Sequence, residues 1–453
     1  MTQVLQLDPS AVQAYGFRGA ALFVLGRYQE CADDNTQVLE VDPTNDNALS
    51  NRANARNHVG DSEGALDDYN QALEINPGDP DNHAQRGTLL YTLGAFEESI
   101  ADFNAVLAVE PTNSVCLSNR GMAYKDLGDF ESAHEDLKKA IELEPDNTVY
   151  MFNHAAVLFY AKRYPEAVEL NSFLIKADPN SALAFVNRAN AYNKLGDHDK
   201  AIEDYSSAIK LDSGDFDALY NRGLIYHQRR DFASAAEDYS RAIEISPNVP
   251  ILHFGRSQAR ASMGELDAAL ADMDKAISLD QANANSLLVH RGNLHARNGS
   301  HKAAIDDFSR VLTERADPVV LMCRGMSLAA TGDFSKAMSD LDEALNQDHA
   351  DVAGIQLHRA NILNKAGEST KAIEAATAAI NVQPSAQAHV FRLIARLALG
   401  EFEEAEADHA AASRMVSATL GVANRVQASG DTALEAELRR LRECVDQRKP
   451  PDA

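Results

Sequence analysis

Residues 182–215 read ALAFVNRANAYNKLGDHDKAIEDYSSAIKLDSGD, and copies of this 34-residue stretch make up almost the whole sequence. The stretch has the apolar spacing of two short amphipathic helices with a Leu-Gly-Asp turn between them. A period of this length is typical of helical solenoids, in which every unit packs against its neighbours. The stretch therefore predicts an all-α solenoid.

Two residue types keep the register of the copies. An arginine recurs every 34 residues through the first eight copies, with His154 in its one missing place, and afterwards at intervals of 33 or 35 residues. These arginines are Arg18, Arg52, Arg86, Arg120, Arg188, Arg222, Arg256, Arg291, Arg324, Arg359 and Arg392. A glycine in the turn slips together with them, at Gly26, Gly60, Gly94, Gly128, Gly196, Gly264, Gly299, Gly332, Gly367 and Gly400. Because two separate positions shift together, chance does not explain the period.

The grid divides the chain into about twelve repeats of 33–35 residues, which we expect to span residues 12–417. Residues 1–11 match the end of a second helix, so we interpret them as the tail of a truncated preceding repeat. Residues 418–447 have the pattern of a degenerate repeat or capping helix pair, with a coiled-coil or partner helix as the alternative. Residues 448–453 are expected to be a disordered tail.

Composition narrows the function classes. The 453 residues carry a net charge of −26, which argues against nucleic acid as a partner because phosphates would be repelled. No stretch has the length and apolarity of a membrane span or the pattern of a secretory signal, so we expect a soluble cytoplasmic protein without membrane insertion. The four cysteines lie far apart, and no phosphate loop, HExxH or GxSxG motif occurs. We therefore expect no catalytic residues, no metal site and no cofactor.

Three further positions recur in the repeats. A small residue follows the grid position in all repeats but the last, where Leu393 stands. Proline closes many repeats, and an aromatic residue often stands two places after the turn position: Tyr28, Phe96, Phe130, Tyr164, Phe232, Phe334 and Phe402. This pattern resembles the tetratricopeptide repeat family over roughly residues 1–417. The resemblance implies a right-handed superhelix whose first helices line a concave groove, a role in protein–protein binding, and no catalysis.

An aspartate stands sixteen residues after most grid arginines, as in Arg188 and Asp204. The fifth repeat loses both partners, with His154 and Leu170 in their places. This joint loss favours a structural ion pair, within a repeat or across the boundary to the next, over a ligand-binding role for the arginines.

Amide side chains precede the grid arginine in several repeats, at Asn51, Asn119, Asn153, Asn187 and Asn221, with Gln85 in the gap. An amide both donates and accepts, so a row of amides can hold the backbone of an extended peptide. The row looks like the asparagine ladder in the repeat region of O-linked N-acetylglucosamine transferases, and the resemblance implies that it faces the concave groove. Asn190 and Asn193 are further groove candidates. The alternative is that these amides only satisfy nearby backbone or water.

Aromatic side chains cluster on the same expected groove, and Phe152, Tyr160, Tyr220 and Phe254 are the anchors that would suit a peptide partner. The alternative is that about half of them pack between first helices. Repeats five to eight are therefore the expected contact region.

Family members that hold the EEVD tail of chaperones use lysines of their first helices. The corresponding positions here hold no basic residue: Gly16, Ser50, Ala84, Ser118, Phe152, Val186, Tyr220 and Phe254. A clamp for EEVD tails is therefore not expected.

These observations favour a non-catalytic scaffold or adaptor that binds polypeptide along the groove, as a subunit of a larger assembly such as a cytoskeletal or ciliary one. The alternative is the substrate-recruiting arm of a larger enzyme such as an O-linked glycosyltransferase. Self-association through the N-terminal face or the C-terminal helix is a third hypothesis.

Overall fold

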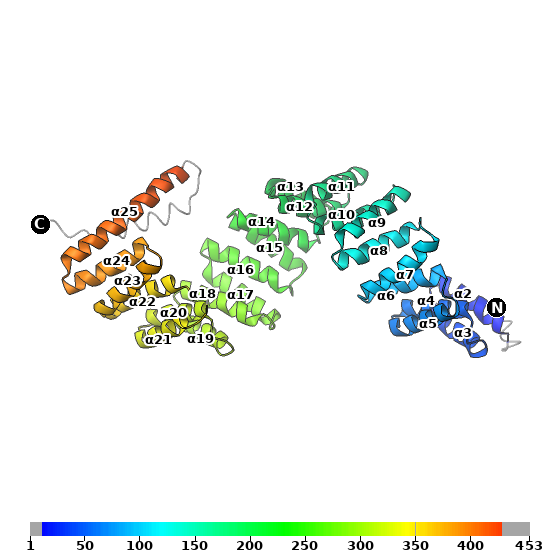
Figure 1. Ribbon diagram of the computed structural model, residues 1–453, viewed down its shortest axis with the longest axis horizontal. Helices are drawn as coiled ribbons and strands as arrows, with labels where there is room; N and C mark the ends of the chain where they lie inside the picture. The colour runs from blue at the N-terminus through cyan, green and yellow to red at the C-terminus, as the bar shows by residue number, and fades with distance from the viewer. Residues whose placement is uncertain (1–10, 349, 428–453) are drawn as a thin grey trace. The chain divides into compact units, whose positions relative to one another are not determined.

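The computed structural model describes residues 11–348 and 350–427, which form twelve helix pairs (Figure 1). The first helices of the pairs are α2 Val12–Val24, α4 Asp46–Val59, α6 Pro80–Thr92, α8 Ser114–Asp126, α10 Thr148–Tyr160, α12 Ala182–Leu195, α14 Phe216–Gln228, α16 Pro250–Met263, α18 Ala284–Arg297, α20 Pro318–Ala330, α22 Val352–Ala366 and α24 Ala386–Leu399. The second helices are α3 Tyr28–Val41, α5 Ser62–Ile75, α7 Phe96–Val109, α9 Phe130–Leu143, α11 Tyr164–Ala177, α13 His198–Leu211, α15 Phe232–Ile245, α17 Leu266–Leu279, α19 His301–Leu312, α21 Phe334–Leu345, α23 Ser369–Val382 and α25 Phe402–Gln427.

By its internal contacts the chain divides within α14 into two compact units, Met1–Ile225 and Tyr226–Ala453. From α2 to α13 and from α15 to α25, each helix packs against the helices before and after it, and first helices of neighbouring repeats also touch, as α8 and α10 do. The prediction of an all-α solenoid is confirmed. None of the helices in the described ranges is both long and apolar enough to cross a lipid bilayer.

The repeat at residues 182–215 shows why the chain folds into pairs. The Ser181 hydroxyl accepts a hydrogen bond from the backbone N–H of Ala184 and so caps α12. Gly196 ends the helix with a φ of 80°, in the left-handed region that costs glycine little. The Asp197 carboxylate then caps α13, so the turn between the helices is only two residues long. Residues next to the helix ends thus supply the caps of α12 and α13.

All ten turn glycines predicted by the grid have a positive φ. In the two repeats that lack this glycine, Lys162 and Arg230 take its place with φ values of 60° and 62°. The turn geometry is therefore kept even where the side chain disfavours it, at a cost that glycine avoids.

Small residues allow the paired helices to approach closely. A Cβ atom added to Gly292 would lie 2.6 Å from Cε1 of Phe308, which is completely buried on the second helix of the same repeat. The predicted role of the position after the grid arginine is confirmed here, because no side chain larger than hydrogen fits.

Residues 418–427 continue α25 without a break, so the helix runs past the expected end of the last repeat at residue 417. The rest of the expected cap, residues 428–447, lies outside the described residues, as do the expected repeat tail up to residue 10 and the expected disordered tail.

Candidate functional site

The grid arginines form ion pairs inside their own repeats. Arg188 on α12 donates from Nε and Nη2 to the two carboxylate oxygens of Asp204 on α13, both at 2.7 Å. Asp204 is only 4% exposed. The same two-point contact joins Arg18–Asp34, Arg52–Asp68, Arg86–Asp102, Arg120–Asp136, Arg256–Asp272, Arg291–Asp307, Arg324–Asp340 and Arg392–Asp408. The predicted structural pairing is confirmed, and it lies within a repeat.

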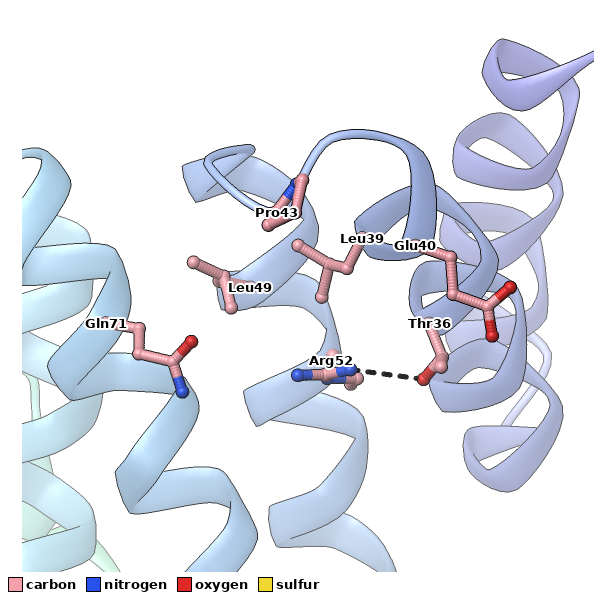
Figure 2. Close-up of a pocket in the computed structure, with 7 residues that line it drawn as sticks. All are labelled: Thr36, Leu39, Glu40, Pro43, Leu49, Arg52 and Gln71. Atoms are coloured by element: carbon pink, nitrogen blue, oxygen red, sulfur yellow. Dashed lines mark hydrogen bonds between the residues drawn. The ribbon is translucent and has the colours of Figure 1, made fainter.

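The arginines make a third contact that the sequence did not reveal. Nη1 of Arg52 on α4 donates to Oγ1 of Thr36 on α3, at 3.3 Å, beside a shallow pocket that Leu49 and Gln71 also line (Figure 2). Nη1 of Arg188 reaches Oγ of Ser172 on α11 in the same way, at 3.0 Å. Each such guanidinium therefore joins three helices of two consecutive repeats. The available signal was a Ser, Thr, Asn or Asp two places after the aspartate position in most repeats.

The fifth repeat replaces this contact by a histidine pair. Nδ1 of His134 on α9 lies 2.7 Å from Nε2 of His154 on α10, so one ring donates and the other accepts. Burial, together with His134 and Arg163 nearby, lowers the pKa of His154 to about 4. Burial lowers the pKa of His134 as well, so both rings are neutral at pH 7. This neutral hydrogen bond joins the fourth repeat to the fifth, while Leu170 at the aspartate position leaves the fifth repeat without the charged bidentate pair.

The predicted asparagines lie where neighbouring first helices meet. Nδ2 of Asn119 donates to Oγ1 of Thr88 on α6, at 3.5 Å, and Nδ2 of Asn153 donates to Oγ of Ser118 on α8, at 3.2 Å. These bonds cross from one first helix to the preceding one. Each uses one amide N–H, which leaves the rest of the amide's hydrogen-bonding capacity for other partners.

Asn51, Asn187 and Asn221 occupy the same position on α4, α12 and α14 and are half-buried. We call the surface formed by Asn51, Asn119, Asn153, Asn187, Asn221 and the first-helix residues around them the first-helix face. All of these residues belong to the unit Met1–Ile225.

Asn190 and Asn193 make contacts within the sixth repeat. Oδ1 of Asn190 accepts from the hydroxyl of Tyr205, at 2.5 Å, and that tyrosine ring is completely buried on α13. Oδ1 of Asn193 lies 3.1 Å from Nδ1 of His198 at the start of α13. Their carbonyl oxygens therefore join the two helices of one repeat. These oxygens are less available to a peptide than the amides at Asn187 and the equivalent positions.

The predicted aromatic anchors differ in exposure. Phe152 packs against a core formed by Met151, Leu174 and Ala184. Tyr160 is 58% exposed, and Nζ of Lys125 lies 5.7 Å from its ring centre. Within this set Tyr160 is the ring open to a partner.

The other two predicted anchors are half-buried. Burial raises the pKa of Tyr220. Phe254 belongs to the unit Tyr226–Ala453, where its ring meets that of His290 edge-on at 5.0 Å between centres. Part of the surface of each ring is therefore covered by packing within the chain.

A polar chain that the sequence did not suggest crosses three first helices. The hydroxyl of Tyr91 on α6 donates to Oδ2 of Asp126 on α8, at 2.8 Å. Oδ1 of Asp126 pairs with Lys125 at 3.0 Å, and Lys125 also lies over Tyr160 on α10. The chain fixes one exposed ring on the first-helix face. Tyr91 and Lys125 hold one repeat position and Asp126 and Tyr160 the next, but the residue type differs at each, so no grid displays them.

The solved structures that resemble this chain are repeat proteins of low sequence identity. A tetratricopeptide repeat protein from Parabacteroides merdae is 20% identical, with 55% of this chain and 98% of that one covered and a TM-score of 0.46. MamA from Desulfovibrio magneticus is 23% identical, with 37% and 95% covered and a TM-score of 0.35. The APC/C hetero-tetramer Cut9–Hcn1 is 13% identical, with 95% and 96% covered and a TM-score of 0.42. No partner of this chain follows from these similarities.

No curated protein sequence matches the chain significantly. Two family models of the tetratricopeptide repeat do match it. One covers residues 186–250, 254–319 and 324–380, and the other covers residues 47–79 and 114–147. Together these segments exceed half of the 453 residues. The chain therefore belongs to the tetratricopeptide repeat family.

Proposed function

We propose that this chain is a non-catalytic scaffold that binds an extended polypeptide segment on the first-helix face of residues 11–225. Tetratricopeptide repeats are protein-interaction modules in general, and the specific proposal rests on the chemistry of this face. One observation carries it: the row of amides on adjacent first helices is only partly occupied by contacts within the chain.

The charge distribution supports the proposal. The chain has 68 acidic residues, but α8, α10 and α12 contain a single carboxylate among them, that of Asp126, which Lys125 pairs. The negative charge therefore lies away from this part of the face. A polar surface with few carboxylates and one exposed ring suits the backbone and side chains of a peptide.

The proposed role fits a subunit of a larger assembly, including a cytoskeletal or ciliary one. It also fits the recruiting arm of a larger enzyme, because both roles require a bound polypeptide and no chemistry. Affinity purification followed by mass spectrometry separates the two. Structural proteins as the main partners support the assembly, whereas a bound transferase supports the recruiting arm.

The test of binding replaces Asn119, Asn153, Asn187 and Asn221 together by alanine. We expect the variant to lose the partners that the wild-type chain captures while circular dichroism shows an unchanged helix content. The matched control replaces four exposed asparagines outside the first helices, Asn76, Asn180, Asn248 and Asn381. Unchanged capture by the first variant, or an equal loss in the control, would refute the proposed function.

A further inference from the structure

Three exposed apolar side chains stand in a row on consecutive first helices. Val115, Val149 and Leu183 are each the second residue of α8, α10 and α12, and they are 56%, 60% and 56% exposed. The same position holds Asp81 on α6 and Asp217 on α14, both exposed. The apolar row is therefore three repeats long and has a carboxylate at each end.

The apolar row runs beside the amide row. Residues four apart on a helix lie on the same side, one turn along. Asn119, Asn153 and Asn187 stand four residues after Val115, Val149 and Leu183 respectively. Each of the three first helices thus presents an apolar side chain and an amide about 6 Å apart along its axis.

The spacing between the helices sets the spacing of a ligand. The first helices α6, α8, α10 and α12 each contact the next one in this series, and the bond from Asn153 to Ser118 and the position of Lys125 over Tyr160 show this for α8 and α10. Axes of packed helices lie about 8–10 Å apart. A polyproline II segment has three residues per turn and rises about 3.1 Å per residue, so its side chains repeat on one side every 9 Å or so. This repeat matches the distance from one first helix to the next.

We propose that the first-helix face binds a segment in the polyproline II conformation that carries an apolar side chain at every third position. Three such side chains contact Val115, Val149 and Leu183, and the neighbouring amides bond to the free backbone groups of the segment. A lysine or arginine about three residues beyond each outer apolar position pairs with Asp81 or Asp217. This inference rests on the proposed function and names the chemistry of its partner.

Two other peptide conformations fit less well. A β-strand places side chains of one face about 6.6 Å apart, so its apolar residues fall out of step with the helices. In an α-helical ligand, residues seven apart lie on the same side at about the distance between adjacent first helices. Its backbone N–H and C=O groups are already hydrogen-bonded within the helix, however, and cannot bond to the amides.

The test uses three synthetic peptides that carry the same fluorescent label and have the same amino-acid composition. The first peptide carries valine at every third position with an arginine at each end, the second carries valine at every second position, and the third is a helical peptide with valine at every seventh. In fluorescence anisotropy titrations we expect the first to bind at least about tenfold more tightly than the others. Equal binding of all three, or preference for the helical peptide, would overturn the inference.

Variants of the protein test the two parts of the surface separately. Val115→Ser, Val149→Ser and Leu183→Ser together should weaken the first peptide about tenfold or more. A control with serine at the exposed apolar positions Val41, Val109 and Val382 of second helices should not.

Asp81→Asn with Asp217→Asn should weaken the arginine-ended peptide and leave a peptide with uncharged ends unaffected. An unchanged affinity of the triple serine variant contradicts the inference. If, in that case, replacing Asn119, Asn153, Asn187 and Asn221 by alanine still abolishes capture of partners, the proposed function stands while this inference fails.

Discussion

Replacing Arg188 by alanine removes three hydrogen bonds that join α11, α12 and α13. Two of them end on Asp204 and one on Ser172. Because Asp204 is only 4% exposed, the variant leaves a carboxylate that is almost out of reach of water and has lost its countercharge. Breaking a buried pair in this way typically costs about 3–5 kcal/mol. The Arg188 side chain is itself 19% exposed, so its removal admits some water, and we expect a loss near the lower end.

The assay must report on the repeats concerned, because a long repeat array need not unfold in one step. Hydrogen exchange followed by mass spectrometry resolves peptides from α12 and α13, and urea unfolding gives the overall change. The matched control is Lys200→Ala, which removes the solvent-exposed pair with Asp197 and should change little. The double variant Arg188→Ala with Asp204→Ala should be more stable than Arg188→Ala alone, because no buried charge remains. If Arg188→Ala exchanges as slowly as the control, the ion pairs do not hold the repeats together.

Three more predictions concern single positions. The pKa of His154 is about 4 in the folded chain and about 6.5 in the unfolded chain. The contribution of this residue to stability should therefore be complete above pH 6.5 and fall by up to about 3 kcal/mol as the pH drops to 4. The double variant His154→Arg with Leu170→Asp should abolish this dependence in urea titrations across that range. Lys162→Gly should raise stability by about 0.5–1 kcal/mol, since it relieves a φ of 60°, and an unchanged melting curve would contradict this. Gly292→Ala should cost about 1–3 kcal/mol by thermal unfolding, because its Cβ would meet the buried ring of Phe308, whereas a neutral result would mean that the helices can separate.

The sequence was enough to predict the fold because the same physical requirements recur in every repeat. The turn after α12 needs a positive φ, which explains the glycine at 196, and the contact between paired helices needs a small residue, as at Gly292. The pairing of Arg188 with Asp204 was also visible, because both partners keep a fixed residue type and the fifth repeat loses both at once.

The remaining contacts were not visible because they demand a property rather than a residue type. The third arginine bond needs any short polar acceptor, which is Thr36 for Arg52 but Ser172 for Arg188. Similarly, nothing in a repeat pattern shows that Tyr160 stays exposed while Phe152 packs into a core. Such differences depend on the side chains of the adjoining repeats.

The fold places structural and exposed residues side by side on one helix. On α12, Arg188 turns toward Asp204 on the second helix, while Asn187 beside it lies on the first-helix face. A change at Asn187 therefore need not disturb the ion pair, so this face can change from repeat to repeat while the arginine grid stays fixed. Gly255 holds the same position on α16, where a Cβ would lie 2.9 Å from the ring of Tyr239 on the preceding second helix. Such a ring does not by itself end the amide row, because Tyr205 holds the equivalent place on α13 before Asn221. Packing against the preceding second helix therefore does not alone decide how far the row extends.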